Sequence, residues 1–345
     1  MKTNRNVGMR RVLSVVGAAS VLAAALSFGV TPSLGETPKM SMGIPAIPPV
    51  FVGVQAMVAE KQGFFAKYGL DVKVRPFANG SEASRAVVAG NIDASLSPTP
   101  LVINQISNAG IELVGIYGTE KPDYYLASTD PNATCKSVVG QPVGVDTPGG
   151  ALSIALKNML ARCGASIDQV QQVALSANVP TAVAAGQLKY AVLHLDGVMA
   201  VQDQTGKPVK IITDYQATKP VYHNMLVIAT RKTLAAKRDQ YVRLVAALIS
   251  AERYMRDPAN RSTVAKIATA TGRSEKEAAQ ALEKYIEMGF WPHDSNGMTK
   301  ANIEMVAQDQ VKAGNIRRGK TVAPYDRVVD LTIFPEALAL ANKNR

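Results

Sequence analysis

Alternating strand-like and helix-like segments constrain this chain more than any other feature of its sequence. From residue 36 to residue 230, short apolar runs rich in β-branched residues alternate with segments whose apolar residues recur at helical spacing. This alternation is typical of a parallel sheet with helices on both of its faces, so we predict an α/β protein. In the first part of the chain we expect strands at 39–44, 70–76, 92–96 and 111–117, separated by helices at 50–61, 81–89 and 101–108.

The same alternation returns in a second part, and the chain then becomes helical. Two further strands, at 124–128 and 224–230, are the natural crossovers between two lobes. We therefore predict a first lobe from 36–125 and 224–345, a second lobe from 126–223, and a helical tail that packs back on the first lobe. The second part is expected to hold strands at 142–145, 170–175, 190–193 and 209–212, and the tail is expected to hold helices at 237–256, 261–271, 274–288 and 299–313.

The N-terminus has the organisation of an export signal. Four basic residues precede residues 12–30, which are almost wholly apolar or small. Ser33 and Gly35 then stand at the −3 and −1 spacing that a signal peptidase reads, so residues 1–35 are predicted to be removed before Glu36. Cleavage after Gly29 and retention as a membrane anchor are the alternatives. We expect the rest of the chain to be exported to the periplasm.

The charge balance narrows the classes of partner. Loss of Lys2, Arg5, Arg10 and Arg11 with the signal lowers the formal charge from +11 to +7. No cluster of Lys and Arg interleaved with aromatic residues occurs, which argues against nucleic-acid binding. Beyond the signal, no apolar run has the length of a membrane span. We expect a basic exported protein of two lobes.

The two cysteines are candidates for one disulfide bridge. Cys135 shortly precedes a predicted strand, and Cys163 closes the helix that follows that strand. Because such a helix runs back antiparallel to its strand, its end returns near the strand's beginning. The periplasm is oxidising, so we expect the two thiols to pair, and two separate buried thiols are the alternative.

Four segments, in their order and spacing, resemble one family of binding proteins. Residues 59–72, AEKQGFFAKYGLDV, resemble the family pattern A-x-x-x-G-F-F-x-x-x-G-L-x-V. Residues 88–94 and 182–191 look like its two helix-to-strand steps, and residues 226–229 look like its return crossover. The family is the sulfonate/nitrate/taurine and thiamine-precursor-binding group of periplasmic substrate-binding proteins of ABC transporters.

The resemblance implies a fold and a function. The fold is the type II periplasmic-binding-protein fold, in which two lobes close around a ligand in their cleft. The function is to deliver that ligand to a membrane permease, with an ATPase on the inner side. An enzymatic branch of the group carries a cysteine cluster that this chain lacks. Tyr190-Ala191 stands where the second helix-to-strand step usually has Asp-Ala, which weakens the resemblance locally.

Other motifs in the sequence give little support for a nucleotide or metal site. Residues 314–321, GNIRRGKT, match the phosphate-loop pattern, but a helix pattern precedes them and Pro324 interrupts any helix that would follow. A basic surface turn is the expected structure. The histidines His194, His223 and His293 lack the spacing of metal ligands, so no metal site is predicted. We expect no cofactor and no catalytic group.

The candidate binding residues follow predicted strands, because ligands of open α/β sheets sit beyond the carboxyl ends of strands. The hydroxyl residues, and Asp196, are equally suited to cap helices. The candidates are Pro45 and Ala46 after the first strand, Ser97 and Thr99 after the third, Thr147, Gly149 and Gly150 before a long helix, His194 and Asp196 after a second-lobe strand, and His223 near the return crossover.

The expected ligand is a small organic anion, such as a sulfonate or a carboxylate. Gly149 and Gly150 allow a ligand to approach free N–H groups at the positive end of a helix, and the basic balance agrees with an anion. A neutral or cationic heterocycle of thiamine-precursor type, anchored by Asp196, is the alternative. For the function, a pyrimidine-synthase-like enzyme and a sensory binding protein are two further alternatives. We expect the protein to be monomeric.

Overall fold

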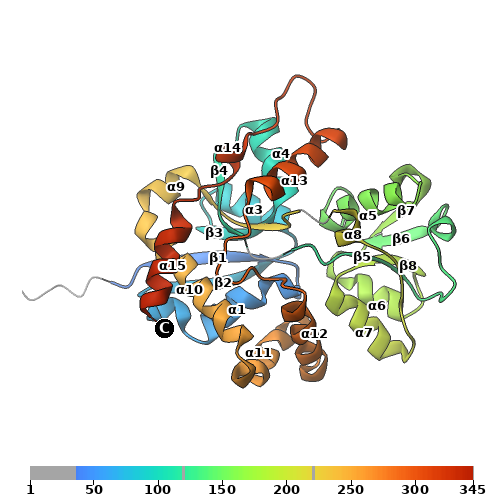
Figure 1. Cartoon of the computed structure of the whole chain (residues 1–345), viewed down its shortest axis with the longest axis horizontal. Helices are drawn as coiled ribbons and strands as arrows, with labels where there is room; N and C mark the ends of the chain where they lie inside the picture. The colour runs from blue at the N-terminus through green and yellow to red at the C-terminus, as the bar shows by residue number, and fades with distance from the viewer. Residues whose placement is uncertain (1–35, 119–120, 220–221, 345) are drawn as a thin grey trace, which may run out of the picture. The chain divides into compact units, whose positions relative to one another are not determined.

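Two five-stranded sheets organise the computed structural model, which describes residues 36–118, 121–219 and 222–344 (Figure 1). Residues 37–345 form one compact unit. The predicted export signal, residues 1–35, lies outside the described residues. Below, lobe 1 denotes the first sheet with the helices packed on it, and lobe 2 denotes the second. The predicted lobe boundaries at 125/126 and 223/224 stay predictions.

The sheet of lobe 1 is mixed. Its strand order is β2-β1-β3-β10-β4, where β1 is parallel to β2 and β3, and β10 is antiparallel to β3 and β4. The sequence predicted a parallel sheet, and β10 departs from it because the chain re-enters this sheet from lobe 2. The strands are β1 (Lys39–Pro45), β2 (Asp71–Phe77), β3 (Ala94–Pro98), β4 (Leu113–Gly118) and β10 (Met225–Thr230).

The sheet of lobe 2 repeats this arrangement. Its order is β7-β6-β8-β5-β9, with β6 parallel to β7 and β8, and β5 antiparallel to β8 and β9. Again the antiparallel strand is the one by which the chain crosses between sheets. The strands are β5 (Tyr125–Ser128), β6 (Pro142–Val145), β7 (Gln171–Ala174), β8 (Tyr190–Leu193) and β9 (Lys210–Asp214).

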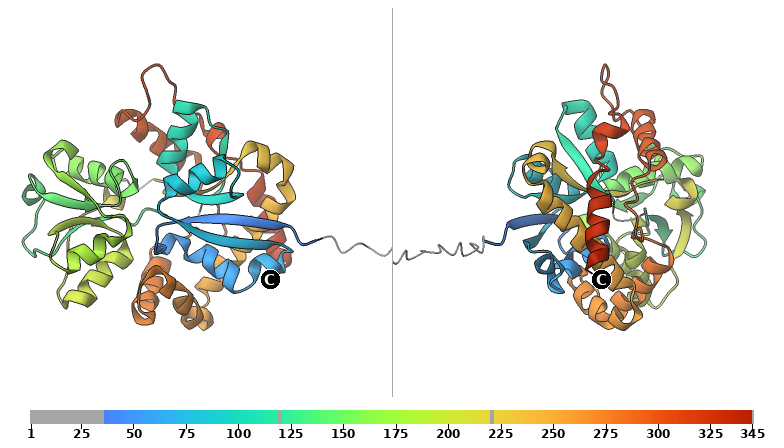
Figure 2. Two further views of the ribbon diagram at one scale, coloured as in Figure 1. Left: turned by 180° about the vertical axis from the view of Figure 1, so that it is seen from behind. Right: turned by 60° about the vertical axis from the view of Figure 1, so that its left-hand side comes forward.

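Alternating side chains of the lobe 1 strands supply two separate apolar cores. In β10, Met225, Val227 and Ala229 point into one core, whereas Leu226 and Ile228 point into the other. This period of two is what a strand buried on both faces requires. Figure 2 shows helices on both faces of this sheet. The helices between its strands are α1 (Val54–Lys61), α2 (Phe64–Lys67), α3 (Gly80–Val88) and α4 (Thr99–Ala109).

The helical tail packs back on lobe 1, as predicted. Leu244 and Leu248 of α10 lie in the same core as Met42 of β1, and α15, which the sequence patterns missed, packs beside α10 through Ala337 and Ala341 (Figure 1). The tail comprises α9 (Arg231–Ala236), α10 (Arg238–Arg256), α11 (Arg261–Ala268), α12 (Glu275–Glu287), α13 (Lys300–Lys312), α14 (Tyr325–Val328) and α15 (Ile333–Lys343).

The helices of lobe 2 follow its strands directly. Leu152, Leu156, Met159 and Leu160 form the buried stripe of α5, as the spacing predicted. The lobe 2 helices are α5 (Ala151–Arg162), α6 (Val179–Ala184), α7 (Leu195–Thr205) and α8 (Tyr215–Thr218). Short 3-10 turns lie at Phe51–Gly53, Lys136–Val138, Ile167–Gln169, Ser176–Asn178, Pro258–Asn260 and Thr269–Thr271.

A disulfide joins Cys135 to Cys163, which confirms the predicted pairing. Their Cα atoms lie 5.1 Å apart, because α5 runs back along the sheet and ends near the beginning of β6. The bridge therefore closes the β6–α5 unit of lobe 2. In the part of the chain that the structure describes, no helix is both long enough and apolar enough to span a bilayer.

Candidate ligand-binding cavity

A cavity of about 630 Å³ lies between the carboxyl ends of strands from both sheets. This is where ligands of open α/β sheets bind, and the volume falls in the range of small-molecule sites. Its lining comes from the segments after β1, β2, β6, β7 and β8, from the two crossovers, and from the turn before α12. The polar lining residues are Asn79, Asp123, Tyr124, Asp146, Thr147, Ser176, Asn178, His194, Asp196, Asn224 and Arg273.

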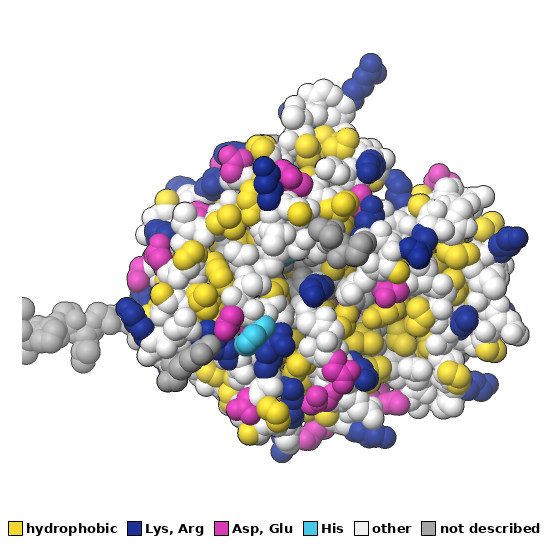
Figure 3. Space-filling view, viewed as in Figure 1, with side chains coloured by type: hydrophobic (Ala, Val, Ile, Leu, Met, Phe, Trp, Pro, Cys, Tyr) yellow, Lys and Arg dark blue, Asp and Glu magenta, His cyan; other side chains and the backbone are white. Residues whose placement is uncertain are grey.

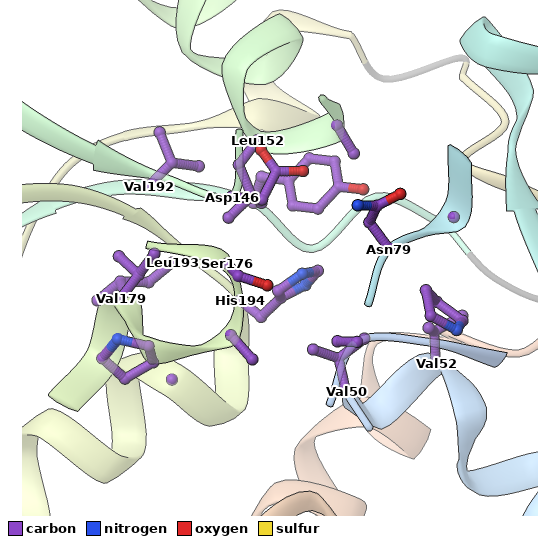
Figure 4. A pocket seen from close by; sticks show the side chains of 18 of the residues that line it. Val50, Val52, Asn79, Asp146, Leu152, Ser176, Val179, Val192, Leu193 and His194 are labelled. Atoms are coloured by element: carbon purple, nitrogen blue, oxygen red, sulfur yellow. The ribbon is translucent and has the colours of Figure 1, made fainter. Parts of the chain in front are cut away.

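The walls of the cavity are largely apolar. Val50 and Val52 of lobe 1 face Leu152 and Leu193 of lobe 2 across it, with the polar groups between them (Figure 4). Phe290 adds an aromatic surface from the tail. Burial of a ligand's apolar surface against these walls contributes about 25 cal/mol of binding free energy per Å². Polar contacts then decide its orientation.

Asp146 occupies the position at which the sequence predicted an anion site. It directly follows the β6 strand, and its carboxylate lies over Gly150, where an added Cβ would come within 2.4 Å of Oδ2. Burial raises the pKa of Asp146, while the backbone amides of Thr147 and Leu152 oppose that rise. The protein's own carboxylate thus lies at the start of α5, where an anionic ligand would need the same backbone amides.

One oxygen of Asp146 has no partner. Its Oδ1 is buried and makes no hydrogen bond to any described residue, although the residue lines the cavity (Figure 4). A buried acceptor left unpaired costs about 1–3 kcal/mol. A ligand that donates a hydrogen bond to this oxygen would recover that cost.

His194 faces the cavity and pairs with Asp123. Its Nδ1 lies 2.9 Å from Asp123 Oδ1, and the Asp123 side chain is wholly buried. Burial alone would lower the pKa of His194, but the charge and the hydrogen bond of Asp123, together with the charges of Asp196 and Asp146, raise it to about 9. The imidazole is therefore a cation at neutral pH, with its other nitrogen available to a ligand.

Asp196 is already held by the protein. Arg273 donates from Nε and Nη2 to its Oδ2, at 3.1 and 2.8 Å, and the hydroxyl of Tyr285 lies 3.0 Å from its Oδ1. The residue is buried. Asp196 lines the cavity, but Arg273 already holds its Oδ2 and the Tyr285 hydroxyl lies beside its Oδ1, so Asp146 is better suited to anchor a ligand.

Asn79 contributes a donor from lobe 1. Its Oδ1 accepts a hydrogen bond from the backbone N–H of Glu82, 2.9 Å away, and so caps α3. The cap fixes the orientation of the side chain, with its amide nitrogen on the side of the cavity (Figure 4). Ser176 lines the opposite wall from a backbone with φ of 51°, a left-handed conformation unusual for serine.

Half of the candidate residues line the cavity, namely Pro45, Ala46, Thr147, His194 and Asp196. The other five lie outside its lining. Ser97 contacts Ser95 and pairs with Leu226 within the sheet, and Thr99 is buried against His223. Gly149 and Gly150 form the turn before α5, beneath Asp146.

His223 lies among buried groups beside the return crossover. Its Nδ1 is 2.8 Å from Thr99 Oγ1, while its Nε2 has no hydrogen-bond partner among the described residues. Burial lowers the pKa of His223 to about 3, so the ring is neutral. This histidine is therefore a buried, neutral ring that lies outside the cavity lining.

Asn79, Asp123, Asp146 and Arg273 were missed by sequence reasoning. Asp146 had a usable signal, because it directly follows a predicted strand and precedes the predicted Thr147–Gly150 turn. Arg273 had none, since it reaches the cavity from the tail, 77 residues after its partner Asp196.

Residues 314–321 lack the strand-to-helix setting of a phosphate loop. They follow α13 as a turn, and no strand precedes them. Figure 3 shows Lys and Arg spread over this face among Asp and Glu, as expected for a basic but unspecialised surface. No cluster of His, Cys, Asp and Glu among the described residues is able to hold a metal ion.

Several solved structures with the same fold are binding proteins. The periplasmic nitrate-binding protein NrtA from Synechocystis PCC 6803 superposes with a TM-score of 0.71 at 14% identity, covering 88% of this chain and 89% of that one. The alkanesulfonate-binding protein SsuA from Xanthomonas axonopodis pv. citri, bound to MOPS, gives 0.67 at 16% identity over 86% and 99%. The ligand-binding component of an ABC-type import system from Staphylococcus aureus gives 0.70 at 12% identity over 87% and 99%.

At these identities the likeness shows the fold, which is the periplasmic-binding-protein fold predicted from the sequence. No curated protein gives a significant match. The family described as "NMT1/THI5 like" matches residues 51–261, a segment that contains every strand except β1 and all cavity-lining segments except the first turn and the tail. Because this match spans more than half of the sequence, the chain belongs to the NMT1/THI5-like family.

Proposed function

We propose that this protein is the periplasmic solute-binding subunit of an ABC importer, which holds one small molecule between its lobes and delivers it to a membrane permease. Family membership, the fold and the cavity between the two sheets support this function. The apolar walls of the cavity and its few convergent polar groups are also typical of a small-molecule binding site.

The ligand that the cavity fits best is a neutral or cationic molecule with an N–H donor, such as an amino-substituted heterocycle. The unpaired Oδ1 of Asp146 carries this proposal. The lining holds the carboxylates of Asp123, Asp146 and Asp196 against the cations His194 and Arg273, so ionised Asp146 leaves one negative charge in excess. An anion placed here would add to that excess in a site of low dielectric, which is unfavourable.

Each polar group has a role in this binding mode. Asp146 accepts from an amino or ring N–H of the ligand, and His194 and Asn79 donate to its acceptors. Leu152, Val50 and Phe290 then enclose the ring. Buried polar groups of this kind reject a molecule that leaves them unpaired, which makes them the source of selectivity.

A small organic anion is the second candidate. The cationic His194 and the amide of Asn79 favour it, as do the nitrate and alkanesulfonate named for two proteins of the same fold. In this mode a sulfonate or carboxylate would bind His194, with Asp146 protonated or turned away. Because burial raises the pKa of Asp146, protonation of its carboxylate costs less free energy than it would for an exposed aspartate.

A thermal-shift panel separates the two candidates. The purified protein is heated with aminopyrimidines, amidines and alkylamines, and in parallel with sulfonates, nitrate and carboxylates. A ligand at about 100 times its Kd adds about 2.7 kcal/mol to the free energy of unfolding, which raises Tm by a few degrees. Stabilisation by the nitrogen bases supports the first candidate, and stabilisation by the anions supports the second. Turnover of a pyrimidine without any binding shift would contradict both and point to an enzyme.

Two substitutions test the anchor. Asp146→Asn replaces one acceptor oxygen by a donor and is expected to remove the shift caused by the nitrogen bases. Asp168→Asn, on the exposed surface of the same lobe, is the matched control and should leave it unchanged. An unchanged shift in Asp146→Asn would exclude Asp146 as the anchor.

A further inference from the structure

The tail helix α12 contacts the beginning of the lobe 2 helix α7. Ala281, Leu282 and Tyr285 of α12 lie in the core of lobe 1, and Leu195 and Met199 of α7 pack against that same core. The ring of Tyr285 is anchored in lobe 1, since it stacks on Phe51 with ring centres 4.8 Å apart. A side chain fixed in lobe 1 therefore meets a helix of lobe 2.

Tyr285 also caps α7. The first N–H groups of any helix lack partners within the helix. In α7, the N–H of Leu195 donates to Asp123 Oδ2 at 3.2 Å, and the N–H of Asp196 donates to the hydroxyl of Tyr285 at 3.3 Å. The hydroxyl itself donates to Asp123 Oδ2, 2.6 Å away. Burial, with the nearby charges of Asp123 and Asp196, raises the pKa of Tyr285 well above its usual range, so the hydroxyl keeps this proton.

Arg273 adds an ion pair at the same place. It stands just before α12, which begins with a capping box of Ser274 and Glu277 that fixes the local backbone. Its guanidinium donates twice to Asp196 in the first turn of α7. The side chains of the pair are only 15% and 5% exposed, so solvent screens their attraction weakly.

We propose that Arg273 and Tyr285 are positioning residues that form a latch between the lobes, holding α12 on the N-terminus of α7 and thereby fixing His194 at the cavity. His194 is the N-cap of α7, and its Nδ1 contacts the same Asp123 that Tyr285 binds. Opening the lobes breaks these contacts together. This inference rests on the function proposed above, in which a ligand binds between two lobes. The latch sets the fraction of molecules in the closed state, and the apparent affinity for the ligand is proportional to that fraction.

Amide hydrogen exchange tests the latch without any ligand. The N–H of Asp196 donates to the Tyr285 hydroxyl, and the N–H of Leu195 donates to Asp123, which Tyr285 also binds. Exchange of these two N–H groups therefore reports the opening of the latch. Tyr285→Phe and Arg273→Met are each expected to raise the exchange rate of the peptide that contains these two residues by about tenfold. Tyr254→Phe and Arg238→Met, which change the same residue types on α10, should leave that rate unchanged.

A second segment separates latch opening from general destabilisation. Val227 of β10 lies in the centre of the lobe 1 sheet, paired with Leu96 and Tyr117. Its exchange should stay slow in both latch variants, while small-angle scattering should show a larger radius of gyration as the lobes separate. An unchanged rate at 195–196, or an equal rise at β10, would overturn the latch. Because no ligand is involved, a failed thermal-shift panel would leave this result standing.

Discussion

The imidazole of His194 and the carboxylate of Asp123 are 2.9 Å apart, although 71 residues separate them in the chain. Asp123 precedes the crossover strand β5, and His194 directly follows the neighbouring strand β8, so antiparallel pairing of β5 with β8 brings them together. A buried carboxylate thus holds a ring that lines the cavity in one orientation, and it gives that ring a charge.

The stability of the protein should depend on pH through His194. Its pKa is about 9 in the folded protein and about 6.5 in an unfolded chain, so the folded state binds the proton more tightly. The stabilisation is complete below about pH 6.5 and is lost as the pH rises through about 9. Tm should therefore fall by a few degrees across this interval. In His194→Gln the fall should be smaller; an equal fall would show that another group titrates.

His223 should make the protein sensitive to acid. Since burial lowers its pKa to about 3, the unfolded chain takes up a proton near pH 6.5 that the folded protein refuses. The free energy of unfolding then falls, as the pH drops from 6.5 to 3, by up to about 1.4 kcal/mol per pH unit from this group. Urea titrations should give a shallower pH slope for His223→Asn than for the wild type. Identical slopes would contradict the buried neutral ring.

Gly150 and Gly149 should respond differently to alanine. A Cβ on Gly150 would meet Asp146 Oδ2 at 2.4 Å, whereas one on Gly149 meets no atom within 4 Å. Gly150→Ala should therefore displace the Asp146 carboxylate and weaken binding of a nitrogen base by about tenfold or more, as loss of a charged hydrogen bond would. Gly149→Ala should lower stability by about 1 kcal/mol through its φ of 76° and leave affinity unchanged. Isothermal titration and urea unfolding measure the two effects.

Reduction of the disulfide should destabilise lobe 2. The bridge spans 28 residues, for which the loss of loop entropy in the unfolded chain corresponds to about 3–4 kcal/mol. Cys135→Ser and Cys163→Ser should each lower the urea midpoint, and dithiothreitol should lower that of the wild type but not that of either variant. A midpoint insensitive to both would mean that the bridge adds no net stability.

The local sequence pattern predicted the fold well, because the strands are short apolar runs bounded by residues that end a strand, such as Gly and Pro. The strands at 142–145 and 190–193 were predicted to the residue, whereas the strand expected at 92–96 runs from Ala94 to Pro98. That shift explains Ser97, which was expected in a loop but lies inside the sheet. The cavity holds two carboxylate–cation pairs, Asp196 with Arg273 and Asp123 with His194. The first depends on how the tail folds back and the second on how β5 pairs, and no local sequence pattern predicts either.

The order of strands also bears on how the chain acquires its structure as it is made. All five strands of the lobe 2 sheet come from one continuous stretch, β5 to β9, whereas β4, at the edge of the lobe 1 sheet, pairs with β10 among the strands that the structure describes. Until residue 230 has been synthesised, β4 lacks its partner and β3 lacks one of its two. The lobe that begins first in the sequence is thus the later of the two to have all its strands available as the chain is made.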